Sequence, residues 1–301
     1  MRPLPARTLA LLLVASASGC VKRMAVNALA DSLSSSGTSS FATDDDLEFV
    51  GDAIPFALKT MESLLQATPE HVGLHQALAS GFTQYAAVYV QLPADELRWS
   101  DTDAFARGTA RAKRFYLRAR GYGLGGLELD HAGFAGLQSA AVSAALATTR
   151  ARDVPLLYWT AAAWLSVIAL SKDDVEFLGQ LPMAASLAQR ALELDESWDQ
   201  GAIHDLLINV EPNLPQPGGV NRARAHFARA VELSQGRRAS PYLSLAEAVS
   251  VPAQDRAEFV SLLEKGLAIN VNASPPDRLA NLYAQERARL LLAHADDLFL
   301  E

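Results

Sequence analysis

The sequence predicts an all-α protein in which helical hairpins stack side by side into an α-α superhelix. Three observations favour this fold class. No stretch alternates between apolar and polar residues for long enough to form a sheet. The candidate helices are separated by proline, glycine, and aspartate or serine caps. Several of them end on the same short pattern, which indicates a repeated unit that buries its apolar face by stacking on the next copy.

The first 19 residues have the parts of a bacterial lipoprotein signal peptide. Arg2 and Arg7 form a basic start, and an uncharged, mostly apolar run follows over residues 9–17. The stretch ASGC at 17–20 then resembles a lipobox, and Cys20 is the only cysteine of the sequence. We expect Cys20 to be acylated and to tether the protein, because each buried acyl methylene contributes about 0.8 kcal/mol. Valine follows it instead of aspartate, which favours the periplasmic side of the outer membrane.

A spacer and a long helical domain are expected after the tether. Residues 20–43 read as a lipid-anchored segment and flexible spacer, which ends in LSSSGTSS and the residues after it. The helical domain is predicted over 44–301. Thr43 and Asp46 have the spacing of a capping box, so we expect the first helix to be capped there. Later helix starts are predicted in the same way at Ser171, Ser240 and Ser274.

The helix endings repeat along the chain. The stretches ALELD, AVELS and GLAIN share one pattern, and GLELD and LLQATP resemble it. The second helix of a tetratricopeptide repeat (TPR) closes in this way. The last apolar residues of these endings are numbers 67, 129, 194, 233 and 269, so successive steps approach one or two repeats of about 34 residues. The tryptophan, leucine-glycine and tyrosine half of the motif is mostly missing, so we predict degenerate TPR-like hairpins.

Two other stretches invite specific readings. GYGLGG at 121–126 formally contains GxGxxG, but a helical segment precedes it where a dinucleotide fold needs a strand. We therefore predict a flexible break in a helix there, not a phosphate site. The apolar run Val154–Leu170 is 17 residues long and is bracketed by Asp153 and Lys172. It is predicted to be a buried core helix, not a membrane span.

Several long stretches resemble one known family. They are KRMAVNALADSL just after Cys20, FATDDDLEFVGDAIPFALKTMESLL, VPLLYWTAAAW with LSKDD behind it, WDQGAIHDLLI, RARAHFARAVELSQGRRASPYLSLAEAVSVPAQDRAEF and LANLYAQERARLLLAHADDLFLE. In these residues the chain is similar to the TatT family, which is associated with TRAP (tripartite ATP-independent) transporters. The likeness spans nearly all of the chain after Cys20, and residues 136–152 fall outside it.

The resemblance implies a function as well as a fold. It implies a periplasmic, TPR-like lipoprotein that works with the periplasmic solute-binding protein of a TRAP transporter. It also implies a homo-oligomer, with a trimer as the expected form, and a cavity for a hydrophobic or organic-acid ligand. The alternative is a general periplasmic TPR scaffold for envelope protein assembly. That scaffold would have an open groove, no enclosed cavity and no dependence on a transporter.

Composition and motifs argue against three other classes. The net charge of −8 disfavours nucleic acid as a partner, since nucleic-acid-binding surfaces are basic. His71 and His75 stand four residues apart, but no HExxH motif accompanies them, so we expect no metal site. There is no GxSxG motif, and His204 and Asp205 are helix neighbours whose side chains point in different directions. We therefore expect no catalytic residues, no cofactor and no enzyme activity.

Four arginines form a candidate docking surface. Arg107, Arg111, Arg114 and Arg118 are spaced by four, three and four residues, which places them within about 60° of one another on a helix. In an acidic protein this is a concentrated positive charge. It is either a solvated helix face or a surface that binds an acidic partner or a ligand carboxylate.

Aromatic and polar residues farther along the chain are candidate cavity-lining groups. They are Tyr158, Trp159, Trp164, Asp205 and Asn209. Trp159 and Trp164 lie about 140° apart on a helix, so the two cannot face one apolar stripe. Either one of them lines a groove or both pack in the core. Asp205 and Asn209 are one helical turn apart and could form a polar contact to a ligand.

Overall fold

The computed structural model describes residues 40–300, and all regular secondary structure in that range is helical. This confirms the predicted fold class. The signal peptide and Cys20 lie outside the described residues. The helices are α2 (Ser40–Thr43), α3 (Leu47–Ala67), α4 (Val72–Ala86), α5 (Leu92–Glu96), α6 (Thr102–Asp130), α7 (Ser139–Thr148), α8 (Val154–Ala169), α9 (Val175–Leu178), α10 (Leu181–Leu194), α11 (Ala202–Val210), α12 (Gly219–Leu233), α13 (Ser240–Leu245), α14 (Arg256–Leu267), α15 (Arg278–Ala293) and α16 (Ala295–Leu298).

The helices pair into successive antiparallel hairpins. Helix α4 packs on α6, α8 on α10, α11 on α12, and α13 on α14, while α3 covers α4 at one end and α15 packs on α14 at the other. The first helices of neighbouring hairpins also contact one another, α4 with α8, α8 with α11, α11 with α13, and α13 with α15. Each hairpin thus buries its apolar face against the next, as expected of a solenoid.

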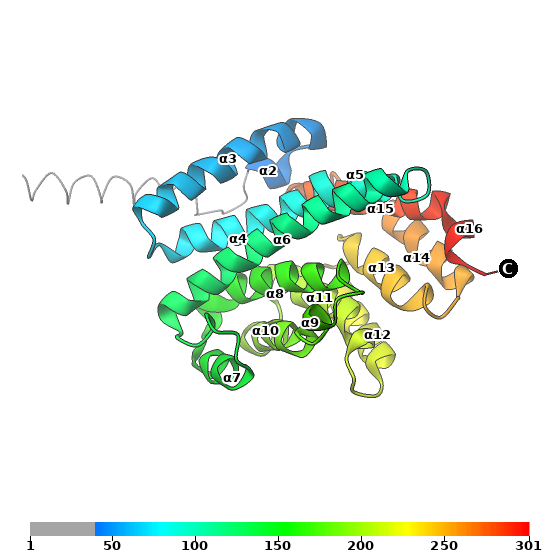
Figure 1. The fold of residues 1–301 in the computed structure, drawn as a ribbon. Coiled ribbons are helices and arrows are strands. Elements are labelled where there is room, and N and C mark those ends of the chain that lie inside the picture. Colours follow the sequence, from blue (N-terminus) through cyan, green and yellow to red (C-terminus); the bar gives the residue numbers. More distant parts are fainter. Residues whose placement is uncertain (1–39, 301) are drawn as a thin grey trace, which may run out of the picture.

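The superhelix curls until its two ends meet, so α15 lies beside α5 and against α2 and α3 (Figure 1). Three contacts join the ends. Arg287 Nη1 lies 2.6 Å from Asp95 Oδ2, and Arg278 donates to the carbonyl oxygen of Thr43 at 2.7 Å. The rings of Trp99 and His294 stack with their centroids 3.8 Å apart. The ends of the solenoid are therefore tied to each other, where an open array would leave them free.

The predicted helix endings are confirmed to within two residues. Expected after residues 67, 129, 194, 233 and 269, the endings fall at Ala67, Asp130, Leu194, Leu233 and Leu267. The pattern succeeds because its apolar residues complete the buried stripe of a helix and the polar residue after them leaves it.

Two predicted caps are wrong by about one turn. The Thr43 hydroxyl bonds back to Ser40, and the first long helix is capped by Asp46, whose carboxylate accepts from the amide of Phe49 at 2.9 Å. Ser171 is buried and bonds to Val167, while Asp174 caps α9. In each case an aspartate follows the predicted serine or threonine, and its acceptor-only carboxylate is a strong cap. The starts near Ser240 and Ser274 are confirmed.

The predicted helix break at residues 121–126 is wrong, because α6 runs unbroken from Thr102 to Asp130. The glycines serve close packing. A Cβ on Gly123 would overlap the Thr160 hydroxyl of α8, and one on Gly126 would lie 2.7 Å from His75 Cβ on α4. Helix α6 can approach both neighbours only because these side chains are absent.

The largest core cluster lies around α8 and α10. It contains Trp164, Leu157, Leu187 and Ile203, all fully buried. Helix α8 is the core helix predicted over Val154–Leu170. Within residues 40–300 we find no helix that is both long and apolar enough to span a bilayer.

Candidate functional site

The four arginines of the predicted docking surface all lie exposed on α6. We call Arg107, Arg111, Arg114 and Arg118 the basic stripe. The opposite side of α6 carries Ala112 and Ala119, both fully buried, so the helix presents one charged and one packed face as its spacing predicts.

One end of the stripe is tied to a buried carboxylate. Glu62 on α3 is 5% exposed and forms ion pairs with Arg118 and with Lys59, the latter at 2.6 Å. The Tyr122 hydroxyl also donates to Glu62, at 2.5 Å. Burial alone would raise the pKa of Glu62, but the bonds from Lys59 and Tyr122 and the charge of Arg118 outweigh it and lower the pKa. Arg118 therefore fastens α6 to α3.

Aromatic rings lie beneath Arg111 and Arg118. The guanidinium of Arg118 sits 4.7 Å from the ring centroid of Phe82, and that of Arg111 sits 5.4 Å from that of Phe115. The two rings stack on each other with centroids 5.9 Å apart. These contacts hold the arginine stems in place while their charges stay exposed.

Arg107 and Arg114 have no ion-pair partner among the residues that the structure describes. Arg111 likewise forms no ion pair within residues 40–300, but its guanidinium lies against the Phe115 ring, so Arg107 and Arg114 are the two members of the stripe with neither an ion pair nor an aromatic contact there.

A pocket of about 300 Å³ opens where the stripe ends, at Arg118. The residues that line it come from α3, α4, α6 and the turn before α4. They are Lys59, Glu62, Leu65, Gln66, Pro69, His75, Arg118 and Tyr122. The polar groups of Glu62, Tyr122 and His75 are already bonded within the protein. The sequence analysis did not predict the buried Glu62 or the pocket beside it. The available signal was the position of Glu62 one turn after Leu58, on the buried face of α3.

The aromatic candidates separate into two groups. Trp164 is fully buried, and its indole nitrogen donates to Gln180 Oε1 at 2.8 Å, so it packs in the core and lines no cavity. Tyr158 and Trp159 are half-buried, and their rings meet edge to face with centroids 4.9 Å apart. Tyr158 also contacts the ring of Trp198.

The two polar candidates on α11 differ as well. Asp205 is half-buried and accepts from the Ser244 hydroxyl of α13 at 2.7 Å. Burial raises the pKa of its carboxyl, and hydrogen bonds from Ser240 and Ser244 oppose that shift. Asn209 is exposed, and its amide turns back to the carbonyl oxygen of Asp205 at 3.3 Å. Of the pair, only Asp205 joins two helices.

A strained turn lies near Tyr158 and Asp205. Asp199, Gln200 and Gly201 all have left-handed backbone conformations, with φ of 45°, 57° and 89°. Such a run in non-glycine residues requires support from its surroundings. Arg238 supplies it by bonding the side chain of Asp199 at 2.6 Å and that of buried Asp277 at 2.9 Å. Nothing in the sequence singled out this network.

A charged cluster closes the ring of helices. The guanidinium of Arg287 on α15 binds Asp95 of α5 at 2.6 Å and Glu247, just after α13, at 2.8 Å. Burial alone would lower the pKa of Arg287, but the two carboxylates outweigh it and raise the pKa well above its usual value. We call these three residues the closure cluster.

The histidines considered as metal ligands serve other purposes. His71 caps α4 by accepting from the amide of Leu74, and both ring nitrogens of His75 lie 3.0 Å from backbone carbonyl oxygens. In the described part of the chain no group of three or more His, Cys, Asp and Glu side chains is placed to hold a metal ion.

Comparisons with known proteins identify the family of this chain. The family model for the TRAP transporter T-component matches residues 43–299. An uncharacterized protein of Treponema pallidum (strain Nichols) is 30% identical over 268 residues, which cover 87% of this chain and 83% of that protein. The earlier resemblance is thereby confirmed, and the chain belongs to the TRAP transporter T-component family.

Proposed function

We propose that the protein is a lipid-anchored periplasmic component of a TRAP transport system that binds the periplasmic solute-binding protein through the basic stripe. Family membership assigns it an accessory role in TRAP transport, and this is a transport family, not an enzyme family. The observation that carries the docking proposal is the unpaired charge of Arg107 and Arg114 on a helix held rigid by α3, in a protein of net charge −8.

The physical effect of such a surface is on recognition. Exposed charges at the rim of an interface steer an oppositely charged partner and fix its orientation, and they affect the rate of association most. We expect the solute-binding protein to present an acidic patch to α6. The ring of hairpins then supplies a stiff frame that holds the basic stripe in place.

The anchor and the assembly belong to the same proposal. Acylation at Cys20, supported by the sequence around it, would hold the protein at the periplasmic side of the outer membrane. The homo-oligomer implied by the resemblance, with a trimer expected, is tested by light scattering on the purified protein. A hydrophobic or organic-acid ligand completes the proposal.

The test is binding of the solute-binding protein to a charge-reversed stripe. In the double variant Arg107→Glu/Arg114→Glu, both changed residues are exposed and form no ion pair within residues 40–300, so the fold should persist. Lys172→Glu/Lys265→Glu makes the same change in net charge at other exposed positions and is the control. We expect the stripe variant to bind about tenfold more weakly at low salt and the control to bind like the unmodified protein.

Other outcomes decide against the proposal. Equal binding by both variants would remove the stripe from the interface. Capture of envelope-assembly proteins in place of the solute-binding protein would favour the general TPR scaffold.

A further inference from the structure

A second pocket, of about 430 Å³, lies far along α6 from the arginines of the stripe. It is formed where α6 ends, by the last turns of α7 and by the short turn before α8. Its lining residues are Asp130, His131, Ala132, Ala144, Ala145, Thr148, Arg150 and Arg152. A pocket of this size falls within the range of small-molecule sites.

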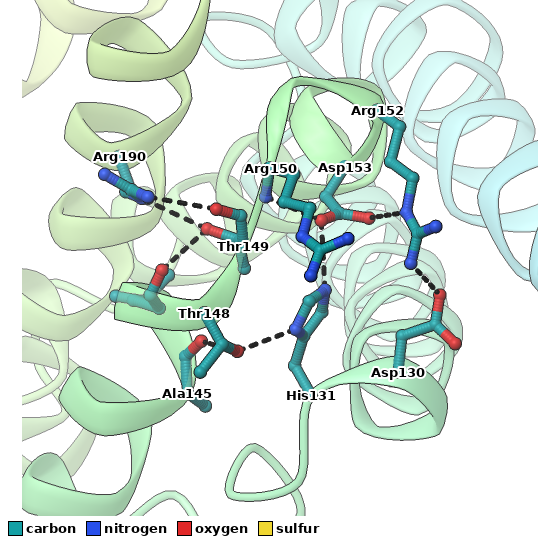
Figure 2. Close-up of polar contacts among 10 residues, drawn as sticks. Asp130, His131, Ala145, Thr148, Thr149, Arg150, Arg152, Asp153 and Arg190 are labelled. Atoms are coloured by element: carbon teal, nitrogen blue, oxygen red, sulfur yellow. Dashed lines mark hydrogen bonds and ion pairs between the residues drawn. The ribbon is translucent and has the colours of Figure 1, made fainter.

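The connection that builds this pocket runs from the end of α6 through α7 to the start of α8, and several contacts hold it in place. Phe134 is fully buried in the core, and the Glu128 carboxylate accepts from three successive amides, those of residues 133, 134 and 135, at 2.7–3.0 Å. Arg190 of α10 binds both the carbonyl and the hydroxyl of Thr149 (Figure 2).

The polar groups at the back of the pocket are already satisfied. Figure 2 shows His131 between Thr148 and Asp153, with its Nδ1 2.7 Å from the threonine hydroxyl and its Nε2 3.0 Å from the carboxylate. Arg152 bridges Asp130 at 3.2 Å and Asp153 at 3.5 Å. These groups form a rigid wall and have little left to offer a ligand.

Arg150 is the exception. Its backbone amide donates to Asp153, but its exposed guanidinium has no hydrogen bond or ion pair among the described residues, and Figure 2 draws none. A guanidinium presents a fork of donors that matches a carboxylate or phosphate. The carboxylates of Asp130 and Asp153 stand nearby and would repel a doubly charged phosphate more strongly than a single negative charge.

Beside its five polar residues, the pocket presents a small apolar surface. Three alanines line it, so the part of a ligand that is not held by Arg150 would lie against methyl groups. We propose that this pocket binds a small monocarboxylate with a compact apolar body, whose carboxylate pairs with Arg150. This proposal deepens the ligand part of the proposed function and rests on that part alone. It does not depend on the docking part, because the pocket is separate from the basic stripe.

The experiment is calorimetric titration of the full-length protein in detergent with 4-methylpentanoate, and with its neutral analogue 4-methylpentanamide. We expect the acid to bind and the amide to bind at least about tenfold more weakly, since only the acid brings a negative charge to the guanidinium of Arg150. Arg150→Gln should weaken the acid by a similar factor. Arg107→Gln, an equal loss of charge on the stripe, should leave its affinity unchanged.

A variant that fills the pocket tests the contribution of its shape separately from the charge of Arg150. Ala144 is exposed on α7, so Ala144→Leu should fold and should block the acid while Arg150 remains. Equal binding of acid and amide, unaltered affinity in Arg150→Gln, or no binding of the acid at roughly 10 mM would each overturn the proposal. None of these outcomes touches capture of the solute-binding protein, so the two proposals fail separately.

Discussion

Removal of Arg287 should open the ring of hairpins. The guanidinium binds two carboxylates, and the side chains of Arg287, Asp95 and Glu247 are only 17%, 16% and 30% exposed. Breaking a buried ion pair by removing one partner costs about 3–5 kcal/mol, because the remaining charge is left unpaired. Partial exposure of these carboxylates places the expected cost of Arg287→Met near the lower end, at about 3 kcal/mol. For a domain of this size that corresponds to a fall in Tm of about 6–12 °C.

The assay is urea unfolding combined with amide hydrogen exchange. Because α15 is tied to α5 through this contact, we expect exchange in α15 to rise before exchange elsewhere. The triple variant Arg287→Met/Asp95→Asn/Glu247→Gln should recover most of the lost stability, since no charge is stranded. Arg289→Met, on the same helix but paired only with exposed Glu286, should change stability by less than about 0.5 kcal/mol. A loss below about 1 kcal/mol for Arg287→Met, or a triple variant as unstable as the single one, would refute the reasoning.

Three further predictions concern packing, capping and pH. Gly123→Ala should destabilise the protein by roughly 1–3 kcal/mol in urea unfolding, because the added Cβ would overlap Thr160 of α8. Gly121→Ala should stabilise it by roughly 0.5–1 kcal/mol, because the space around Gly121 is open and alanine favours the helix. Asp46→Ala should cost about 1 kcal/mol through loss of the cap on α3, and an unchanged urea midpoint would contradict that role. Burial lowers the pKa of both His204 and His226, so the unfolded chain takes up protons first as pH falls. The urea concentration at the unfolding midpoint should therefore decrease as the pH is lowered below about 6.5. The double variant His204→Gln/His226→Gln should show a weaker dependence on pH.

Much of the fold could be predicted because it is encoded locally. The end of a helix depends on its last apolar residues and on the polar residue that follows, so Ala67, Leu194 and Leu233 were placed correctly from pattern alone. The apolar helix α8 was likewise identified by its composition. Caps were harder, since neighbouring acceptors compete and only the backbone geometry decides among them.

What could not be predicted depends on residues distant in sequence. Gly123 and Gly126 look like a helix break until Thr160 and His75 are known to lie against them. The closure cluster joins Asp95 to Arg287, and no periodicity within either helix indicates that contact.

In the candidate site, too, local features could be predicted and contacts between distant residues could not. The spacing of the basic stripe correctly gave one exposed face, but it could not show that Arg118 is tied to Glu62 while Arg107 and Arg114 are not. The alternatives left open for Trp164 were decided by its burial. Arg150 was overlooked because a single arginine has no spacing to read, and its pocket exists only once α6 and α7 meet.

The central claim is that the basic stripe binds the solute-binding protein, and one comparison of affinities tests it most directly. The purified solute-binding protein of the same transporter is titrated onto the immobilised unmodified protein, onto Arg107→Glu/Arg114→Glu and onto Lys172→Glu/Lys265→Glu, at low and at high salt. We predict a loss of about tenfold confined to the stripe variant, which shrinks as salt screens the charges. Identical affinities for all three proteins at low salt would contradict the claim and place the interface elsewhere on the ring.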